Sequence, residues 1–347
     1  MSNGPERSEK VLVAMSGGVD SSVAAALLRD QGYDVTGVTL KLWGGESDSG
    51  CCSVSDVEDA RRVAAQLGIP HYVFNLADDF TRHVVDPYVD AFTTGSTPNP
   101  CVECNRSIKF GRLLDRAVAL GFDRLATGHH ARVRRVGDAY ALCRGVDTAK
   151  DQSYVLYMLG QSALSRTLFP VGELTKADVR ATAATLGLRT AEKPESMDVC
   201  FIQRGQRTAF IDARATTSPG DVVDTAGVVV GHHDGIDRFT VGQRRGLGIA
   251  TGARRYVVDI DAPRATVMIG SRGDLLRGSV ELRDVSFVGA PHPGTDLLAQ
   301  ARAHGEPVAA SLEGTTVTFL ARQPRVAPGQ VVALYDGDVL VGGGIAT

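Results

Sequence analysis

A turn of small residues near the amino terminus constrains the fold more than any other stretch. The segment 14–28, "AMSGGVDSSVAAALL", joins a short apolar run at 11–15 to an alanine-rich stretch. Apolar runs of this kind form buried parallel strands, and the alanine-rich part favours a helix. Glycine lets the backbone come close to a ligand, and the N–H groups that open a helix suit a phosphate. The segment therefore predicts a phosphate-binding strand, turn and helix.

The chemistry of this turn differs from that of the common lysine-containing ATP loop. The GxxxxGK[ST] pattern places a lysine on the phosphates, and no lysine stands in the turn. Ser16, Ser21 and Ser22 offer hydroxyl groups instead, and Asp20 is suited to hold a magnesium ion that bridges phosphates. A tight turn of small residues without a ligand is the alternative interpretation.

The next 180 residues alternate between strand and helix patterns. Strands are expected at 33–43, 70–76 and 122–130, and helices at 55–69, 108–121 and about 175–186, the last with a capping box at "TKAD". This alternation predicts an α/β fold with a parallel sheet and ligands at the carboxyl ends of its strands. Leu40 and Gly128 follow two such strands and are expected to border the nucleotide.

The sequence pattern changes after about residue 205, where turn signals recur at short intervals and helical periodicity is lost. We predict a nucleotide-binding and catalytic domain over 1–205, a small central domain over 206–271 and a carboxyl-terminal β-barrel over 272–347. The polar start and the lack of a long apolar stretch predict a cytoplasmic protein with no membrane partner.

Charge is unevenly distributed along the chain. The formal net charge is −3, yet the segment 238–256 holds five arginines and no acidic residue. A polyanion is therefore an admissible partner, with solvated charged faces as the alternative. Arg244 and Arg245 stand on a glycine-flanked loop where they could meet a phosphate.

The cysteines do not form the spacing of a secreted disulfide framework. Cys101 and Cys104 stand at C-x-x-C spacing in "STPNPCVECNRSIKFG", and Cys200 stands in "SMDVCFIQRG". Two prolines beside Asn99 rigidify the preceding loop, which favours a held ligand or a reactive thiol. By itself the C-x-x-C pair is compatible with redox chemistry, metal binding or chance.

Taken together, these motifs resemble a known family. "SGGVDS" resembles the pyrophosphate-binding loop of enzymes that adenylate a substrate with ATP. With "GCCSVSDVEDARRVA", "TPNPCVECN", "ATGHHARV", "KDQSYVLYML", "DVCFIQRG" and "FTVGQRRGLGI", the chain resembles the tRNA-specific 2-thiouridylases from residue 11 to its end. The resemblance implies conversion of a wobble uridine of tRNA to 2-thiouridine, with ATP and Mg²⁺ as cofactors. The partners implied are tRNA and a sulfur donor, either a cysteine desulfurase or a sulfur-relay protein.

The resemblance also assigns roles to individual residues. Cys104 matches the nucleophile and Cys200 the persulfide carrier, and the two can pair as a disulfide after sulfur transfer. The residues implied to contact ATP are Ala14, Met15, Ser16, Gly17, Gly18, Val19, Asp20, Ser21, Leu40 and Gly128. Those implied to contact tRNA are Asn99, Pro100 and Cys101 at the flipped base, and His129, Lys150, Asp151, Gln152, Arg302 and Gln330 elsewhere. For His130 a structural role is favoured.

Cys101 departs from the commonest family pattern, which has an aspartate there as a proposed general base. A thiol with a lowered pKa can still act as a base. Alternatively, Cys101, Cys104 and Cys200 would supply three thiolates to a [4Fe–4S] cluster. Cys51 and Cys52 are assigned to a mobile loop, and Cys143 is expected to be a buried strand residue.

Three classes of function remain open from the sequence. The first is an ATP-dependent tRNA sulfurtransferase. The second is a ligase that adenylates a small metabolite, which would leave the cysteines unexplained. The third is an iron–sulfur or nucleotide-binding module without turnover.

Overall fold

The computed structural model describes residues 8–43, 54–194, 199–203, 205–249, 252–289, 296–303 and 305–347. These residues form two compact units. The first unit comprises residues up to 83, 101–203 and 338–340, and the second comprises 84–100, 204–337 and 341–347. Cys51 and Cys52 lie outside the described residues.

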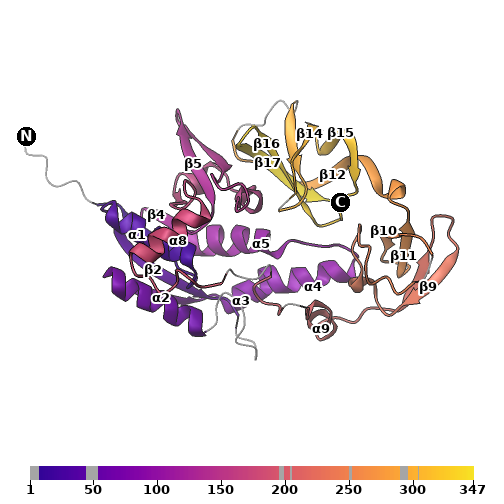
Figure 1. Ribbon diagram of the computed structural model, residues 1–347, viewed down its shortest axis with the longest axis horizontal. Coiled ribbons are helices and arrows are strands. Elements are labelled where there is room, and N and C mark those ends of the chain that lie inside the picture. Colours follow the sequence, from indigo (N-terminus) through magenta and orange to yellow (C-terminus); the bar gives the residue numbers. More distant parts are fainter. Residues whose placement is uncertain are drawn as a thin grey trace, which may run out of the picture. The chain divides into compact units, whose positions relative to one another are not determined.

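A five-stranded parallel sheet forms the centre of the first unit (Figure 1). Its order is β3 (His71–Asn75), β2 (Asp34–Lys41), β1 (Lys10–Ala14), β4 (Arg124–Thr127) and β7 (Thr167–Leu168). Every pairing in this sheet is parallel. The parallel sheet expected from the alternating pattern is therefore confirmed.

Three helices cover one face of this sheet because their apolar sides pack on β1. They are α1 (Val19–Asp30), α2 (Val54–Leu67) and α8 (Lys176–Thr185). Val23, Val63 and Val179, one from each helix, join Val11 and Val13 of β1 in a single buried apolar cluster. Thr175 caps α8 and forms the expected capping box with Asp178, so that prediction is confirmed.

The cysteine pair lies in a helical run that begins earlier than predicted. The sequence indicated a helix from Ile108, but the run starts at Pro100 and continues through α5 (Pro100–Glu103), the π-helix η2 (Cys104–Leu113) and α6 (Leu114–Ala119). Proline is tolerated in the first turn of a helix, where its missing N–H has no helical acceptor. The loop therefore ends at Asn99, and the second proline of the pair belongs to the first turn of the helix.

The remaining elements of the first unit are short. They are α3 (Ala77–Phe80), η1 (Thr81–Val85, which runs on into the second unit), η3 (Ser153–Leu156), α7 (Gln161–Leu164) and the hairpin β5 (Ala131–Val136) with β6 (Ala139–Arg144). Val339 and Leu340 pair with β6. Cys143, in β6, is 1% exposed, which confirms the expected buried strand residue.

The second unit combines two helices with two sheets. The helices are α4 (Asp86–Thr93) and α9 (Arg207–Asp212). A four-stranded sheet has the order β10 (Tyr256–Asp261), β11 (Thr266–Gly270), β8 (Gly220–Val223) and β9 (Val229–His233), accompanied by the short helices η4 (Ile236–Arg238) and η5 (Gly273–Leu275).

The last strands of the chain close into a ring. The order is β12 (Leu276–Phe287), β15 (Thr316–Pro324), β14 (Val308–Glu313), β13 (Leu297–Gln300), β16 (Val331–Asp336) and β17 (Val339–Ala346), and β12 also pairs with β17. The chain thus has a parallel sheet with helices first, then a small sheet, and finally a β-barrel. This order confirms the predicted α/β class with a terminal β-barrel. No helix in the described ranges is long and apolar enough to span a bilayer.

Candidate functional site

The glycine turn between β1 and α1 is held by its own serines. The backbone N–H of Ser16 donates to Ser21 Oγ at 3.1 Å, and Ser22 Oγ donates to the carbonyl oxygen of Gly18 at 2.8 Å. Gly17 has φ +73°, and a Cβ there would lie 2.3 Å from the carbonyl oxygen of Asp56 in α2. Only glycine fits this position, both for its backbone conformation and for its space.

The loop after β4 packs directly on the first turn of α1. A Cβ on Gly128 would lie 2.6 Å from the backbone nitrogen of Ser21 and 2.8 Å from the carbonyl carbon of Asp20. In β2, which pairs with β1, Thr39 Oγ1 donates to the carbonyl oxygen of Met15 at 2.8 Å, and the next residue, Leu40, is 8% exposed. The structure thus brings the predicted nucleotide residues together at the carboxyl edge of the sheet.

A lysine far away in sequence reaches this turn. Lys176 Nζ, from the first residue of α8, lies 2.7 and 2.6 Å from the two carboxylate oxygens of Asp20. His130 Nε2 lies 3.2 Å from Asp20 Oδ1. Burial raises the pKa of Asp20, but the hydrogen bonds from His130 and Lys176 outweigh it and hold the pKa below its usual value. Sequence reasoning missed Lys176 and favoured a structural role for His130.

A second lysine ties the segment after α8 to α2. Lys193 Nζ lies 2.6 Å from Asp56 Oδ1 and 2.7 Å from Asp59 Oδ2. Burial lowers the pKa of Lys193, and the two carboxylates outweigh this effect and raise it above its usual value. The contact fixes this segment to the helix whose backbone crowds Gly17.

His129 points into an apolar pocket rather than toward Asp20. It is 7% exposed, its Nδ1 lies 2.6 Å from Thr127 Oγ1, and its ring contacts Phe110 and Phe169 with centroids 6.0 and 5.7 Å apart. Burial lowers the pKa of His129 well below its usual value, and the charges of Lys109 and His130 lower it further. The imidazole is therefore neutral.

This buried neutral histidine predicts a loss of stability in mild acid. The unfolded imidazole takes up a proton below about pH 6.5, whereas the folded one does not. As the pH is lowered below that value, the free energy of unfolding should therefore decrease by up to about 1.4 kcal/mol per pH unit. In denaturant titrations between pH 8 and pH 5, the free energy of unfolding of His129→Phe should decrease less steeply than that of the wild type. Equal slopes in the two proteins would contradict the assignment.

The cysteine segments belong to the same unit as the glycine turn. Cys104 opens η2 and is 8% exposed, while Cys101 in α5 and Cys200 are half-buried. Phe201, beside Cys200, packs on Phe80 of α3 and on Trp43 after β2, with ring centroids 5.5 and 6.2 Å apart. Since α3 also contacts η2, helix α3 connects the Cys200 segment to the helix that carries Cys104.

The three thiols do not assemble into a metal site. Among the described residues, which include Cys101, Cys104 and Cys200, no group of three or more His, Cys, Asp or Glu side chains is placed to hold a metal ion. The described arrangement therefore gives no support to the [4Fe–4S] alternative, and we derive no step through a cluster.

Comparison with known proteins decides the family. The sequence matches the family described as "tRNA methyl transferase HUP domain" over residues 9–204, and two further ones, a "PRC-barrel domain" and an "Aminomethyltransferase beta-barrel domain", over 208–271 and 277–346. The tRNA-specific 2-thiouridylase MnmA of Roseiflexus sp. is 49% identical, and the match covers 96% of this chain and 98% of that protein. This chain belongs to the tRNA-specific 2-thiouridylase family. The namesake from Geobacter metallireducens is 45% identical, over 97% of this chain and 96% of that protein.

Of the residues that the thiouridylase resemblance assigned to tRNA, Asp151 is the most deeply buried charged group. Its side chain is 5% exposed, and its carboxylate accepts from Arg144 and Ser153 Oγ at 2.9 Å each, from the Gly145 N–H at 3.0 Å and from the Ser153 N–H at 3.1 Å. Lys150 is half-buried, and the exposed Gln152 accepts the His130 N–H through Oε1 at 2.9 Å. Asp151 therefore holds the loop that presents its neighbours.

Removing the charge of Asp151 should destabilise the protein. Asp151→Asn removes the charge that pairs with the Arg144 guanidinium, whose side chain is 16% exposed, so we expect a loss of about 3 kcal/mol in unfolding free energy. Lys150→Ala serves as the neighbouring control and should change stability by less than about 0.5 kcal/mol. Urea denaturation measures both. A stable Asp151→Asn variant with impaired tRNA binding would instead indicate a direct tRNA contact.

In the second unit the loop before Asn99 is held from distant parts of the chain. The backbone N–H of Thr97 donates to the carbonyl oxygen of Pro328 at 2.7 Å, and Gln330 Nε2 donates to the carbonyl oxygen of Thr97. Gln330, assigned to tRNA from the sequence, thus supports the loop that ends in Asn99 and Pro100. The guanidinium of Arg302 lies 4.0 Å from where a Cβ on Gly242 would be.

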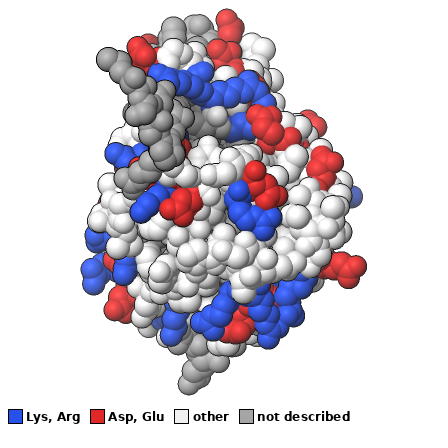
Figure 2. Space-filling view, turned by 90° about the vertical axis from the view of Figure 1, so that its left-hand side faces the viewer, with Lys and Arg blue, Asp and Glu red and all other residues white. Residues whose placement is uncertain are grey.

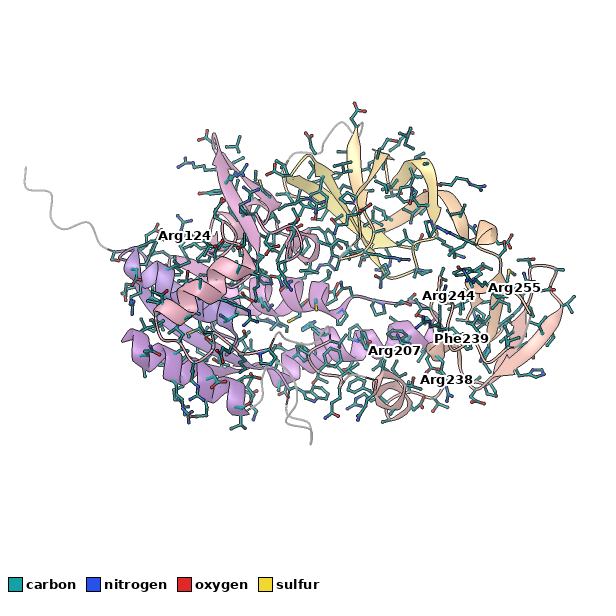
Figure 3. All side chains as sticks on the ribbon, in the orientation of Figure 1. Arg124, Arg207, Arg238, Phe239, Arg244 and Arg255 are labelled. Carbon is teal, nitrogen blue, oxygen red and sulfur yellow. The ribbon has the colours of Figure 1, made fainter. Side chains whose placement is uncertain are left out.

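Arginines gather in the second unit. Figure 3 shows Arg207, Arg238, Arg244 and Arg255 in one region, with Phe239. The Arg207 guanidinium stacks on Phe92 of α4 at 5.1 Å, and Arg238 pairs with Asp234 at 3.2 Å. Arg244 and Arg245 are exposed. By contrast, the face shown in Figure 2 carries Lys and Arg interspersed with Asp and Glu.

Proposed function

We propose that this protein is an ATP-dependent tRNA-uridine 2-sulfurtransferase acting on the wobble uridine. The observation that carries the proposal is that the glycine turn and both cysteine segments belong to one compact unit of a chain of this family. The C2 oxygen of uracil is a poor leaving group. Adenylation of that oxygen, with release of pyrophosphate, turns it into part of AMP, which departs readily when sulfur attacks C2.

The turn and the first turn of α1 would hold the ATP phosphates. The backbone N–H groups of a helix amino terminus and the positive end of its dipole attract anions. Asp20, kept ionised by its donors, is the carboxylate suited to hold Mg²⁺, since that ion takes one or two carboxylates plus substrate phosphates. When bound, Mg²⁺ neutralises phosphate charge. Gly128 allows the nucleotide loop of β4 to close on α1.

The cysteines would deliver the sulfur. The terminal sulfur of a persulfide on Cys200 attacks the activated C2, and AMP leaves with the former C2 oxygen. The Cys104 thiolate then attacks the Cys200 sulfur, which breaks the sulfur–sulfur bond and leaves the terminal sulfur on the base. This step leaves a Cys104–Cys200 disulfide, which a thiol reductant must reduce before the next turnover. The protein that donates sulfur would reload Cys200.

The second unit would supply much of the tRNA surface. The exposed arginines of 238–256 suit phosphate contacts, which position an RNA without reading its sequence. Asn99 and Pro100 would lie against the target base, which has to leave the stack for chemistry at C2. Cys101, in the position where the family commonly has aspartate, would contact the same base.

Reconstitution tests the proposal. Purified protein is incubated with tRNA, ATP, Mg²⁺, a cysteine desulfurase with cysteine and a thiol reductant, and the tRNA is digested to nucleosides. We expect 2-thiouridine, with AMP and pyrophosphate in equal amounts and pyrophosphate release dependent on tRNA. Folded protein that binds ATP but forms no 2-thiouridine would refute it. Pyrophosphate release that depends on an added small metabolite rather than on tRNA would favour a metabolite ligase instead.

A further inference from the structure

The contact between Lys176 and Asp20 is built into the fold rather than formed by two mobile surface chains. The two residues are 156 positions apart, and the side chain of Lys176 is only 14% exposed. The start of α8 is fixed by its capping box and by Asp147, whose Oδ2 accepts the backbone N–H of Lys176 at 2.9 Å. Helices α1 and α8 also share the apolar cluster that contains Val23 and Val179. The ammonium group is therefore positioned in advance at the glycine turn.

The turn itself has a charge that a triphosphate would meet unfavourably. Between residues 14 and 21 the charged side chain is the Asp20 carboxylate, and the turn contributes no cation. Lys176 and the Asp20 carboxylate neutralise each other, since Lys176 Nζ lies 2.7 and 2.6 Å from the two carboxylate oxygens. A ligand that brings phosphate together with a divalent cation offers each partner a better counter-charge.

His130 provides an independent sign that this corner is incomplete without a ligand. It is 3% exposed, and its Nε2 lies 3.2 Å from Asp20 Oδ1. Its Nδ1 is buried and has no hydrogen-bond partner in the part of the chain that the structure describes. Buried polar atoms are rarely left unsatisfied, so such an atom beside a charged cluster points to a missing polar partner.

We propose that Lys176 binds the phosphate oxygens of ATP, and that its contact with Asp20 is the resting position it occupies without nucleotide. The lysine that the turn lacks is thus supplied by α8. This inference rests on the proposed nucleotide site. No covalent bond is made or broken in the exchange. The ammonium passes from a carboxylate to a phosphate, and Asp20 is left for the cation.

Binding measurements with ATP and adenosine distinguish this role from that of a purely structural ion pair between Lys176 and Asp20. Lys176→Met should weaken ATP binding at least about tenfold while leaving adenosine binding unchanged, because only the phosphates lose a partner. Lys176→Arg should restore most of the ATP affinity. Lys193→Met is the matched control, since Lys193 also bridges two carboxylates, and it should leave the ratio of ATP to adenosine affinity unchanged.

Asp20→Asn gives a result of opposite sign under the two interpretations. Without Mg²⁺, the variant should bind ATP several-fold more tightly than the wild type, because the lysine is released and a negative charge is gone. A purely structural ion pair predicts weaker binding. Unchanged ATP binding in Lys176→Met, or equal losses for ATP and adenosine, would overturn the proposal. These assays need no tRNA, so they stand even if the wild type fails to thiolate.

Discussion

Cys104→Ser and Cys200→Ser are each expected to lower the rate of 2-thiouridine formation by about a thousandfold or more. A hydroxyl can neither carry a persulfide nor attack one, and loss of a covalent catalyst has effects of this size or larger. ATP binding should be retained in both, because neither cysteine belongs to the glycine turn. Single-turnover thiolation with nucleoside analysis measures the rate, and calorimetry measures ATP affinity.

Cys143→Ser is the matched control for these variants. Cys143 lies in the same unit but is buried in β6, where burial raises the pKa of its thiol and leaves it protonated. Its replacement should leave the thiolation rate within about twofold of wild type, as expected for a site away from the chemistry. Retained thiolation in Cys200→Ser with the desulfurase as sulfur source would contradict the persulfide role of Cys200.

Gly128→Ala should impair nucleotide binding and stability together. Its Cβ would approach the backbone of Asp20 and Ser21 within 2.8 Å, so the β4 loop and α1 have to separate. We expect a loss of about 1–3 kcal/mol in unfolding free energy and ATP binding weaker by about tenfold or more. Thermal unfolding and ATP titration check both effects.

Gly278→Ala is the control for the glycine effect, since a Cβ on this strand residue would meet no atom within 4 Å. It should leave stability and ATP affinity near wild type. If Gly128→Ala binds ATP as tightly as this control, the β4 loop does not need its close approach to α1.

Local pattern was enough to predict the elements that position the site. The apolar run of β1, the glycine turn and the capping box at Thr175 each carry their own short-range signal, and the structure has all three. Helices over 77–93 lacked such a signal. That segment combines a π-helical stretch with short helical pieces, and its apolar spacing is irregular as a result.

The side-chain contacts of the site could not be predicted in the same way. Lys176 meets Asp20 because α8 packs on α1, and Gln330 reaches Thr97 across 233 positions. Whether His129 or His130 faces Asp20 depends on the backbone path after β4, which the dipeptide sequence does not specify. Side chains that meet only through tertiary packing have no characteristic spacing in the sequence.

The crowding at Gly17 limits how the chain can recover from a change there. The atom that a new Cβ would strike is the main-chain oxygen of Asp56, which every amino acid at that position would carry. No second-site suppressor at residue 56 can therefore make room for a side chain at residue 17. Genetic relief has to come from substitutions that displace the whole start of α2, and these would also disturb its contact with Lys193.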